Sequence, residues 1–244
     1  MTVTAMRIDP KRSGFWVALL VGLLAAAPGY AAGGDDALFT FFQMDQNEVR
    51  LGAHKGYVWE AQGWVGTDFD KAFLKTEGEV GFGEGVEAAE VQVLYSRLIS
   101  DFFDAQAGIR YDFEPDPSRA YAVVGLQGLA PQFFEVDAAL FLSEKADVSA
   151  RLEAEYELLI TQRLVLQPLI EVNLSFQDVD ELDLAAGPTD VEFGLRLRYE
   201  FFREFAPYIG VAYERDLFDT AEITRDHGGD VDALSFVAGI RLFF

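Results

Sequence analysis

Apolar and polar residues alternate along most of the chain after about residue 38. One such segment places Phe103, Ile109 and Phe113 on one face and Asp104 and Arg110 on the other. Alternation with a period of two is typical of a half-buried β-strand, whereas a helix repeats its apolar residues every three or four positions. We find no stretch in this part of the sequence that keeps the helical spacing. The pattern therefore predicts an all-β protein.

About twelve segments alternate in this way, and most contain ten residues or more. Ten residues that rise about 3.3 Å each and tilt by about 45° cover roughly 23 Å, close to the lipid-facing height of a membrane barrel. We therefore predict a transmembrane antiparallel up-and-down β-barrel of about 12 strands, with 10 or 14 strands as alternatives. The segments lie near residues 38–51, 57–66, 70–79, 86–97, 102–113, 119–128, 133–143, 147–160, 163–176, 190–202, 206–215 and 233–244.

Short and long connections also alternate, as expected if short turns face the periplasm and longer loops face outward. The predicted short turns are 67–70, 99–102, 129–132, 161–163 and 202–205. The predicted long loops are 79–86, 114–118, 177–189 and 216–232. An even number of strands would place both ends of the barrel domain in the periplasm.

The first 31 residues have the three regions of an export signal. Three basic residues precede an apolar stretch at 15–27, and small residues follow at 29–31. This arrangement predicts a signal peptide over residues 1–31. Residues 32–244 then form the barrel, in the bacterial outer membrane, with the lipid bilayer and lipopolysaccharide as partners.

The last segment alternates up to the final residue. Phe236, Ala238, Ile240, Leu242 and Phe244 form one apolar face. This pattern resembles the terminal strand of outer-membrane proteins, which the barrel-insertion machinery recognises. We therefore expect Phe244 to contact that machinery.

The chain is strongly acidic, with 41 Asp and Glu against 19 Lys and Arg, and a formal net charge of -22. Such a charge repels phosphate backbones, so nucleic acid is excluded as a partner and cations are favoured. The sequence has no Cys, which excludes a disulfide scaffold and a cysteine-based zinc fold.

Alternation predicts which charged residues point into the barrel. Inward acids could draw cations through the lumen, or they could simply pair with inward bases. Glu153, Glu155 and Glu157 are the best candidates for a cation path, as successive inward positions on one strand. The predicted acids are Glu90, Asp104, Asp112, Glu135, Asp137, Glu153, Glu155, Glu157, Glu171, Glu192 and Glu200. The predicted bases are Arg110, Arg151, Arg196, Arg198 and Arg241.

Three long stretches, at 64–79, 91–168 and 195–215, resemble the barrel domain of the copper resistance protein B family. They include WVGTDFDKAFLKTEGE at the first position and LRLRYEFFREFAPYIGVAYER at the last. The resemblance implies an outer-membrane barrel that binds or conducts copper ions, with a periplasmic multicopper oxidase as a possible partner. Family members commonly carry a Met- and His-rich segment before the barrel. Here Met44 is the one Met after the predicted signal peptide.

The only two histidines suggest a second kind of metal site. With twelve strands, His54 lies in the first outer loop and His227 in the last, and barrel closure makes these loops neighbours. Imidazole binds Cu(II), and Asp226 or Asp230 could complete the site. The alternative is two solvated histidines that never meet. We take Met44 as a further candidate copper ligand.

Three classes of function follow from the sequence. A copper-handling barrel is favoured. A passive cation-preferring porin or structural barrel is the alternative, and an outer-membrane hydrolase is remote. Barrel hydrolases need a Ser/His or Asp/His arrangement on a strand wall, whereas both histidines here lie in predicted loops. We therefore expect no enzymatic activity.

Overall fold

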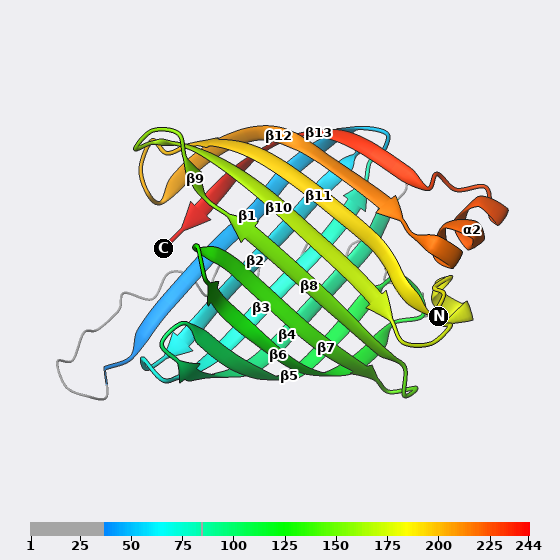
Figure 1. Ribbon diagram of the computed structural model, residues 1–244, viewed down its shortest axis with the longest axis horizontal. Helices are drawn as coiled ribbons and strands as arrows, with labels where there is room; N and C mark the ends of the chain where they lie inside the picture. The colour runs from blue at the N-terminus through cyan, green and yellow to red at the C-terminus, as the bar shows by residue number, and fades with distance from the viewer. Residues whose placement is uncertain (1–36, 84) are drawn as a thin grey trace, which may run out of the picture.

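The computed structural model describes residues 37–83 and 85–244, which form a closed barrel of twelve antiparallel strands (Figure 1). The predicted signal peptide, residues 1–31, lies outside the described residues. The alternation of apolar and polar residues therefore predicted both the fold class and the number of strands. Among the described residues, no helix is long and apolar enough to cross a membrane.

The strands follow one another around the barrel in chain order. Their bounds are β1 (Phe39–Gly52), β2 (Gly56–Gly66), β3 (Asp70–Gly81), β4 (Gly85–Ser100), β5 (Phe103–Glu114), β6 (Arg119–Ala130), β7 (Phe134–Ser143), β8 (Val148–Tyr156), β9 (Leu158–Leu159), β10 (Leu164–Ser175), β11 (Gly187–Tyr199), β12 (Phe205–Asp216) and β13 (Asp232–Phe243). Two short helices complete the fold, η2 (Asp180–Leu182) and α2 (Phe218–Asp226).

β8 and β9 are two parts of one barrel strand, which is interrupted at Glu157. Both parts pair antiparallel with β10: Glu155 lies opposite Leu169, and Leu158 lies opposite Leu166. The sequence predicted one continuous strand over 147–160. The structure interrupts this strand at Glu157 but keeps the same register with β10 on both sides. Glu157 therefore points inward, as predicted, and pairs there with Arg198 and Arg241.

The barrel closes between its first and last strands. The Phe244 amide donates to the Phe42 carbonyl at 2.8 Å, and the Phe42 amide donates to the Phe244 carbonyl at 2.9 Å. The rings of Phe41 and Phe243 pack edge to face beside this pair, with centroids 5.3 Å apart. The final residue therefore takes part in the seam through its backbone.

The two ends of the barrel differ. Short connections lie at the end where β13 finishes, which we call the turn end: 67–69, 101–102, 131–133, 160–163 and 200–204. The long connections 176–186 and 217–231 lie at the opposite end, the loop end, where Figure 1 shows α2. The predicted asymmetry between turns and loops is confirmed for these connections.

Three details of the loop end differ from the sequence prediction. The predicted long loop 114–118 is a connection over 115–118, as short as 160–163 at the turn end. The predicted long loop 79–86 is wrong, because β3 and β4 continue to Gly81 and Gly85, which pair with each other. Gly83 and Gly85 adopt φ of 102° and 114° there, a conformation that glycine allows without strain. Helix α2 was not predicted, because its only buried residues are Thr220 and Ala221, and two buried positions make too weak a periodic signal.

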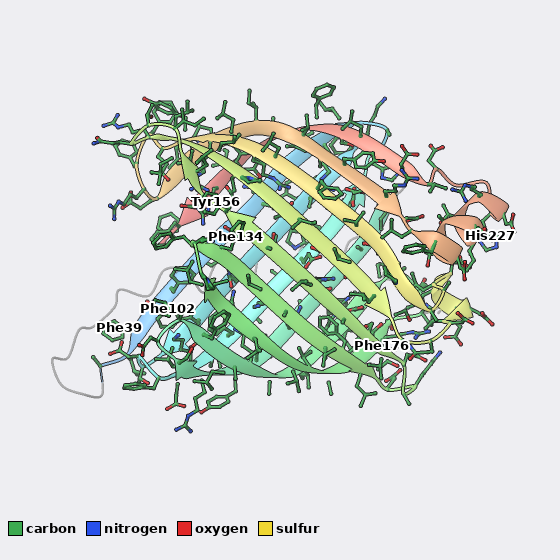
Figure 2. All side chains as sticks on the ribbon, in the orientation of Figure 1. Phe39, Phe102, Phe134, Tyr156, Phe176 and His227 are labelled. Carbon is green, nitrogen blue, oxygen red and sulfur yellow. The ribbon has the colours of Figure 1, made fainter. Side chains whose placement is uncertain are left out.

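Apolar side chains cover the outside of the barrel. Ile109, Val124 and Phe236 are outward residues in mid-strand and remain 65%, 62% and 65% exposed. Figure 2 shows Phe39 and Phe102 beside the turn end, where aromatic side chains form the kind of girdle that marks a membrane interface. The outer surface is therefore suited to lipid.

One wall of the interior is also apolar, which alternation alone did not predict. Phe73, Leu94, Val123 and Phe141 come from β3, β4, β6 and β7 and form a buried cluster inside the barrel. Trp64 packs against this cluster. A barrel of this size can enclose an open lumen, but here side chains fill part of it.

We predict that deletion of Phe244 impairs barrel assembly. The deletion removes both hydrogen bonds to Phe42 and exposes an unpaired edge at the seam. The heat-modifiable, folded fraction in outer-membrane extracts should fall several-fold. Phe202→Ala, at an exposed turn-end position, is the control and should assemble normally. Normal assembly of the deletion variant would contradict the importance of this pairing.

Candidate functional site

Inward carboxylates stand in two rows across neighbouring strands. The strand register places each acid directly opposite the next one. The first row runs across β7, β8, β10, β11 and β12 and consists of Asp137, Glu153, Glu171, Glu192 and Glu214. The second row runs across β2, β3, β4 and β5 and consists of Glu60, Glu77, Glu90 and Asp112.

Rows of this kind are unfavourable without compensation. Like charges that face each other on adjacent strands destabilise a sheet. Removing a charge from water without a partner costs still more. The barrel must therefore supply cations to the two rows from elsewhere on its wall.

Arg151 of β8 connects the two rows. Its guanidinium lies 2.6 Å from Glu77 and 3.2 Å from Glu90 in the second row, and 3.4 Å from Glu171 in the first. Because β8 and β3 are well separated in strand order, these ion pairs cross the lumen. Arg110 adds to the second row at 2.7 Å from Glu90.

A second group of ion pairs neutralises the far end of the first row. Arg50 of β1 lies 3.0 Å from Glu192 and also pairs with Glu214. Glu48, whose side chain is fully buried, accepts from Arg50 at 3.1 Å and from Arg196 at 2.9 Å. These contacts join β1 to β11 and β12 around the seam.

Most other acids that the sequence placed in the lumen are also paired. Glu157 lies 2.6 Å from Arg198 and 2.8 Å from Arg241, so it is the most strongly compensated of the three preferred candidates. The remaining pairs are Glu200 with Arg198 at 3.3 Å, Asp112 with Arg110 at 2.6 Å, Asp104 with Lys71 at 2.5 Å, and Asp137 with Lys75.

The sequence analysis missed the inward bases Arg50, Lys71, Lys75 and Arg119. It also missed the inward acids Glu48, Glu60, Glu77 and Glu214. The signal was present for the two lysines, because Lys71 and Lys75 alternate with Ala72 and Leu74. Arg50 follows an irregularity in the register of β1, which disturbs a simple count of alternate positions.

Of the acids that line the central cavity of the lumen, four have no Lys, Arg or His within 4.0 Å among the described residues. We call Glu60, Glu135, Glu153 and Glu155 the central acids. Gln46 donates to Glu60 at 3.0 Å, and Gln167 donates to Glu155. All four line one cavity of about 320 Å³ in the middle of the lumen.

The two histidines lie near different acids. His54 Nδ1 is 3.4 Å from Glu214, and His227 Nδ1 is 3.5 Å from Asp183. Figure 2 shows His227 at the loop end beside α2. Within the described ranges, no group of three or more His, Asp and Glu is arranged to hold a metal. The site made by His54, His227 and Asp226 or Asp230 stays a prediction.

Met44 lies in β1, opposite Ala61 of β2 and Leu242 of β13. Its neighbours Gln43 and Asp45 line the central cavity, whereas Met44 does not. Its role as a copper ligand also stays a prediction. The cavity wall offers oxygen ligands from carboxylates and amides.

The contact with Glu214 raises the pKa of His54, chiefly because the carboxylate accepts a hydrogen bond from the imidazolium. The contact therefore stabilises the barrel below the ordinary histidine pKa of about 6.5. This contribution is lost as the pH rises through the raised pKa of the folded state. Protons compete with copper for the imidazole nitrogen, so any metal binding by His54 would weaken as the pH falls below that pKa.

We predict that Glu214→Gln lowers the pKa of His54. The change removes the carboxylate and keeps the side-chain volume. Histidine-selective NMR of the barrel in detergent micelles should show the titration midpoint move to lower pH. An unchanged midpoint would contradict the assigned contact.

We predict that Glu48→Ala destabilises the barrel by about 3–5 kcal/mol, because it leaves Arg50 and Arg196 buried without their shared carboxylate. Urea unfolding followed by tryptophan fluorescence measures the free energy of unfolding. Glu144→Ala, at an exposed loop position, is the matched control and should change stability by less than about 0.5 kcal/mol. A loss below about 1 kcal/mol for Glu48→Ala would argue against this network as a source of stability.

Comparison with known proteins identifies the family. The family described as copper resistance protein B precursor (CopB) matches residues 38–244. Copper resistance protein B of Escherichia coli is 41% identical over 211 residues, covering 86% of this chain and 71% of that protein. A homologue from Pseudomonas syringae pv. tomato is 39% identical over 212 residues, with the same coverage.

A solved NanC porin shares the fold at 13% sequence identity, with a TM-score of 0.52, covering 84% of this chain and 99% of that one. This likeness concerns the fold alone. The match over residues 38–244 and the two relatives near 40% identity show that the chain belongs to the copper resistance protein B family.

Proposed function

We propose that this protein is an outer-membrane copper resistance barrel that binds copper ions or conducts them through its acidic lumen. The observation that carries the proposal is the central cavity, where Glu60, Glu135, Glu153 and Glu155 have no cationic partner among the described residues. Family membership supplies the link to copper.

The physical basis is concentration of cations by uncompensated charge. Unpaired carboxylates between low-dielectric walls produce a negative electrostatic potential, which raises the local concentration of cations. Most other acids in the lumen already pair with arginines or lysines. The central acids are therefore where an arriving copper ion gains the most electrostatic free energy.

The ligand chemistry of the cavity favours Cu(II) over Cu(I) as cargo. Cu(I) prefers the soft sulfur ligands of Cys and Met, whereas carboxylate and amide side chains dominate the polar lining here. We assign the protein a role in binding or passage rather than in catalysis.

The proposal also covers location and partners. The apolar outer face and its aromatic residues suit the lipid bilayer and lipopolysaccharide of the outer membrane. The barrel-insertion machinery would contact the seam between β13 and β1, through Phe244. If the turn end faces the periplasm, a periplasmic multicopper oxidase would exchange copper at that end.

A passive cation-preferring porin is the second candidate. The porin-like fold and the absence of a three-ligand metal group from the described residues favour it. Both candidates predict cation selectivity. Only the copper-handling barrel predicts that loss of the gene changes the copper tolerance of the cell. It also predicts that Glu→Gln substitutions in the central cavity change copper tolerance.

We predict that combined Glu60→Gln, Glu153→Gln and Glu155→Gln lowers Cu(II) flux into proteoliposomes several-fold. Each change removes charge and keeps volume, so the barrel should remain folded. The reversal potential across a KCl gradient should move towards that of a less cation-selective pore.

The matched control carries Glu144→Gln, Glu204→Gln and Glu222→Gln, which remove the same charge at exposed positions. It should behave like the wild type. Equal Cu(II) flux in the central variant and the control, with the folded state verified by heat-modifiable migration, would remove the central acids from the proposed path.

A further inference from the structure

The interior of the barrel is divided into cavities along its axis. A cavity of about 250 Å³ lies towards the loop end, with Arg119 and Val179 among its walls. The central cavity of about 320 Å³ follows. A third, of about 460 Å³, lies towards the turn end beside Trp64 and Lys71.

The two junctions between these cavities differ in character. The central and turn-end cavities share a broad set of neutral or small wall residues together with Glu135: Gln43, Gln62, Gln127, Gly128, Leu129 and Glu135. The central and loop-end cavities share only Phe141 and Arg151. This second junction is therefore the narrower of the two, and the Arg151 guanidinium within it is paired with Glu77, Glu90 and Glu171.

Both residues of the narrow junction are held in place. Phe141 is 3% exposed and packs in the inner apolar cluster. The Arg151 guanidinium carbon lies 5.9 Å from the centre of its ring, and that of Arg110 lies 4.7 Å from it. Ion pairs from Arg151 to Glu77 and Glu90 then fix the guanidinium against the opposite wall.

We propose that Arg151, supported by Phe141, is the barrier between the loop-end and central cavities and determines both passage and charge selectivity at this junction. A cation that moves between the two cavities must pass the guanidinium and break its cross-lumen ion pairs. The central acids attract cations, whereas Arg151 opposes their passage towards the loop end. This inference concerns any small cation and stands independently of copper.

The first test opens the junction without changing the net charge of the lumen. Arg151→Gln combined with Glu77→Gln removes one positive and one negative charge that pair at 2.6 Å. Single-channel conductance in KCl should rise several-fold, with a reversal potential closer to that of a cation-selective pore. The control, Arg215→Gln with Glu144→Gln, removes a similar pair of charges from exposed positions and should leave conductance unchanged.

A second test separates charge from volume. Because the chain has no Cys, Arg151→Cys with Glu77→Gln places a unique thiol at the junction. A small neutral methanethiosulfonate reagent should leave conductance high, whereas an aminoethyl reagent restores a positive charge and should lower it. Phe141→Ala widens the same junction without altering an ion pair, and should raise conductance even if the Arg151 variants fold poorly.

Wild-type conductance in the folded Arg151→Gln/Glu77→Gln and Phe141→Ala variants would overturn the proposal. Equal block by the neutral and aminoethyl reagents would overturn the claim that the charge of Arg151 sets selectivity. If either of these variants lowers copper tolerance but leaves KCl conductance unchanged, that result would likewise count against Arg151 as the barrier. It would leave the copper-handling role in place.

Discussion

The interior of this barrel depends on one electrostatic constraint: antiparallel register places carboxylates directly opposite one another on adjacent strands. Two rows show this constraint, from Asp137 to Glu214 and from Glu60 to Asp112. Without cationic side chains from other strands, the carboxylates within each row would repel one another. Arg50 and Arg151 supply these cations across the seam and across the lumen. The same ion pairs fill the lumen, link distant strands and leave the central acids uncompensated.

The sequence predicted what depends on local pattern. Alternation in 102–113 correctly placed Asp112 inward and Ile109 outward, because side-chain direction follows from strand geometry alone. It could not separate Glu153 from Glu157, since both alternate in the same way and their difference lies in arginines that approach from other strands. The contact between Arg151 and Glu77 joins residues 74 positions apart and depends on the diameter and stagger of the closed barrel.

Two functional features follow from this division between paired and unpaired acids. The central acids offer oxygen ligands for a cation. Because most neighbouring acids in the lumen are paired with arginines or lysines, the negative electrostatic potential is concentrated in the central cavity. The narrow junction at Phe141 and Arg151 separates this cavity from the loop end, where His54 and His227 lie near Glu214 and Asp183. Copper handling by this family member would then involve the central cavity more directly than the histidines.

Anomalous diffraction at the copper edge, from crystals of the barrel equilibrated with Cu(II), tests this account most directly. The account predicts a copper peak in the central cavity beside Glu153 and Glu155, and loss of that peak when both are replaced by Gln. Copper bound only at His54 or His227, with an empty central cavity, would contradict it.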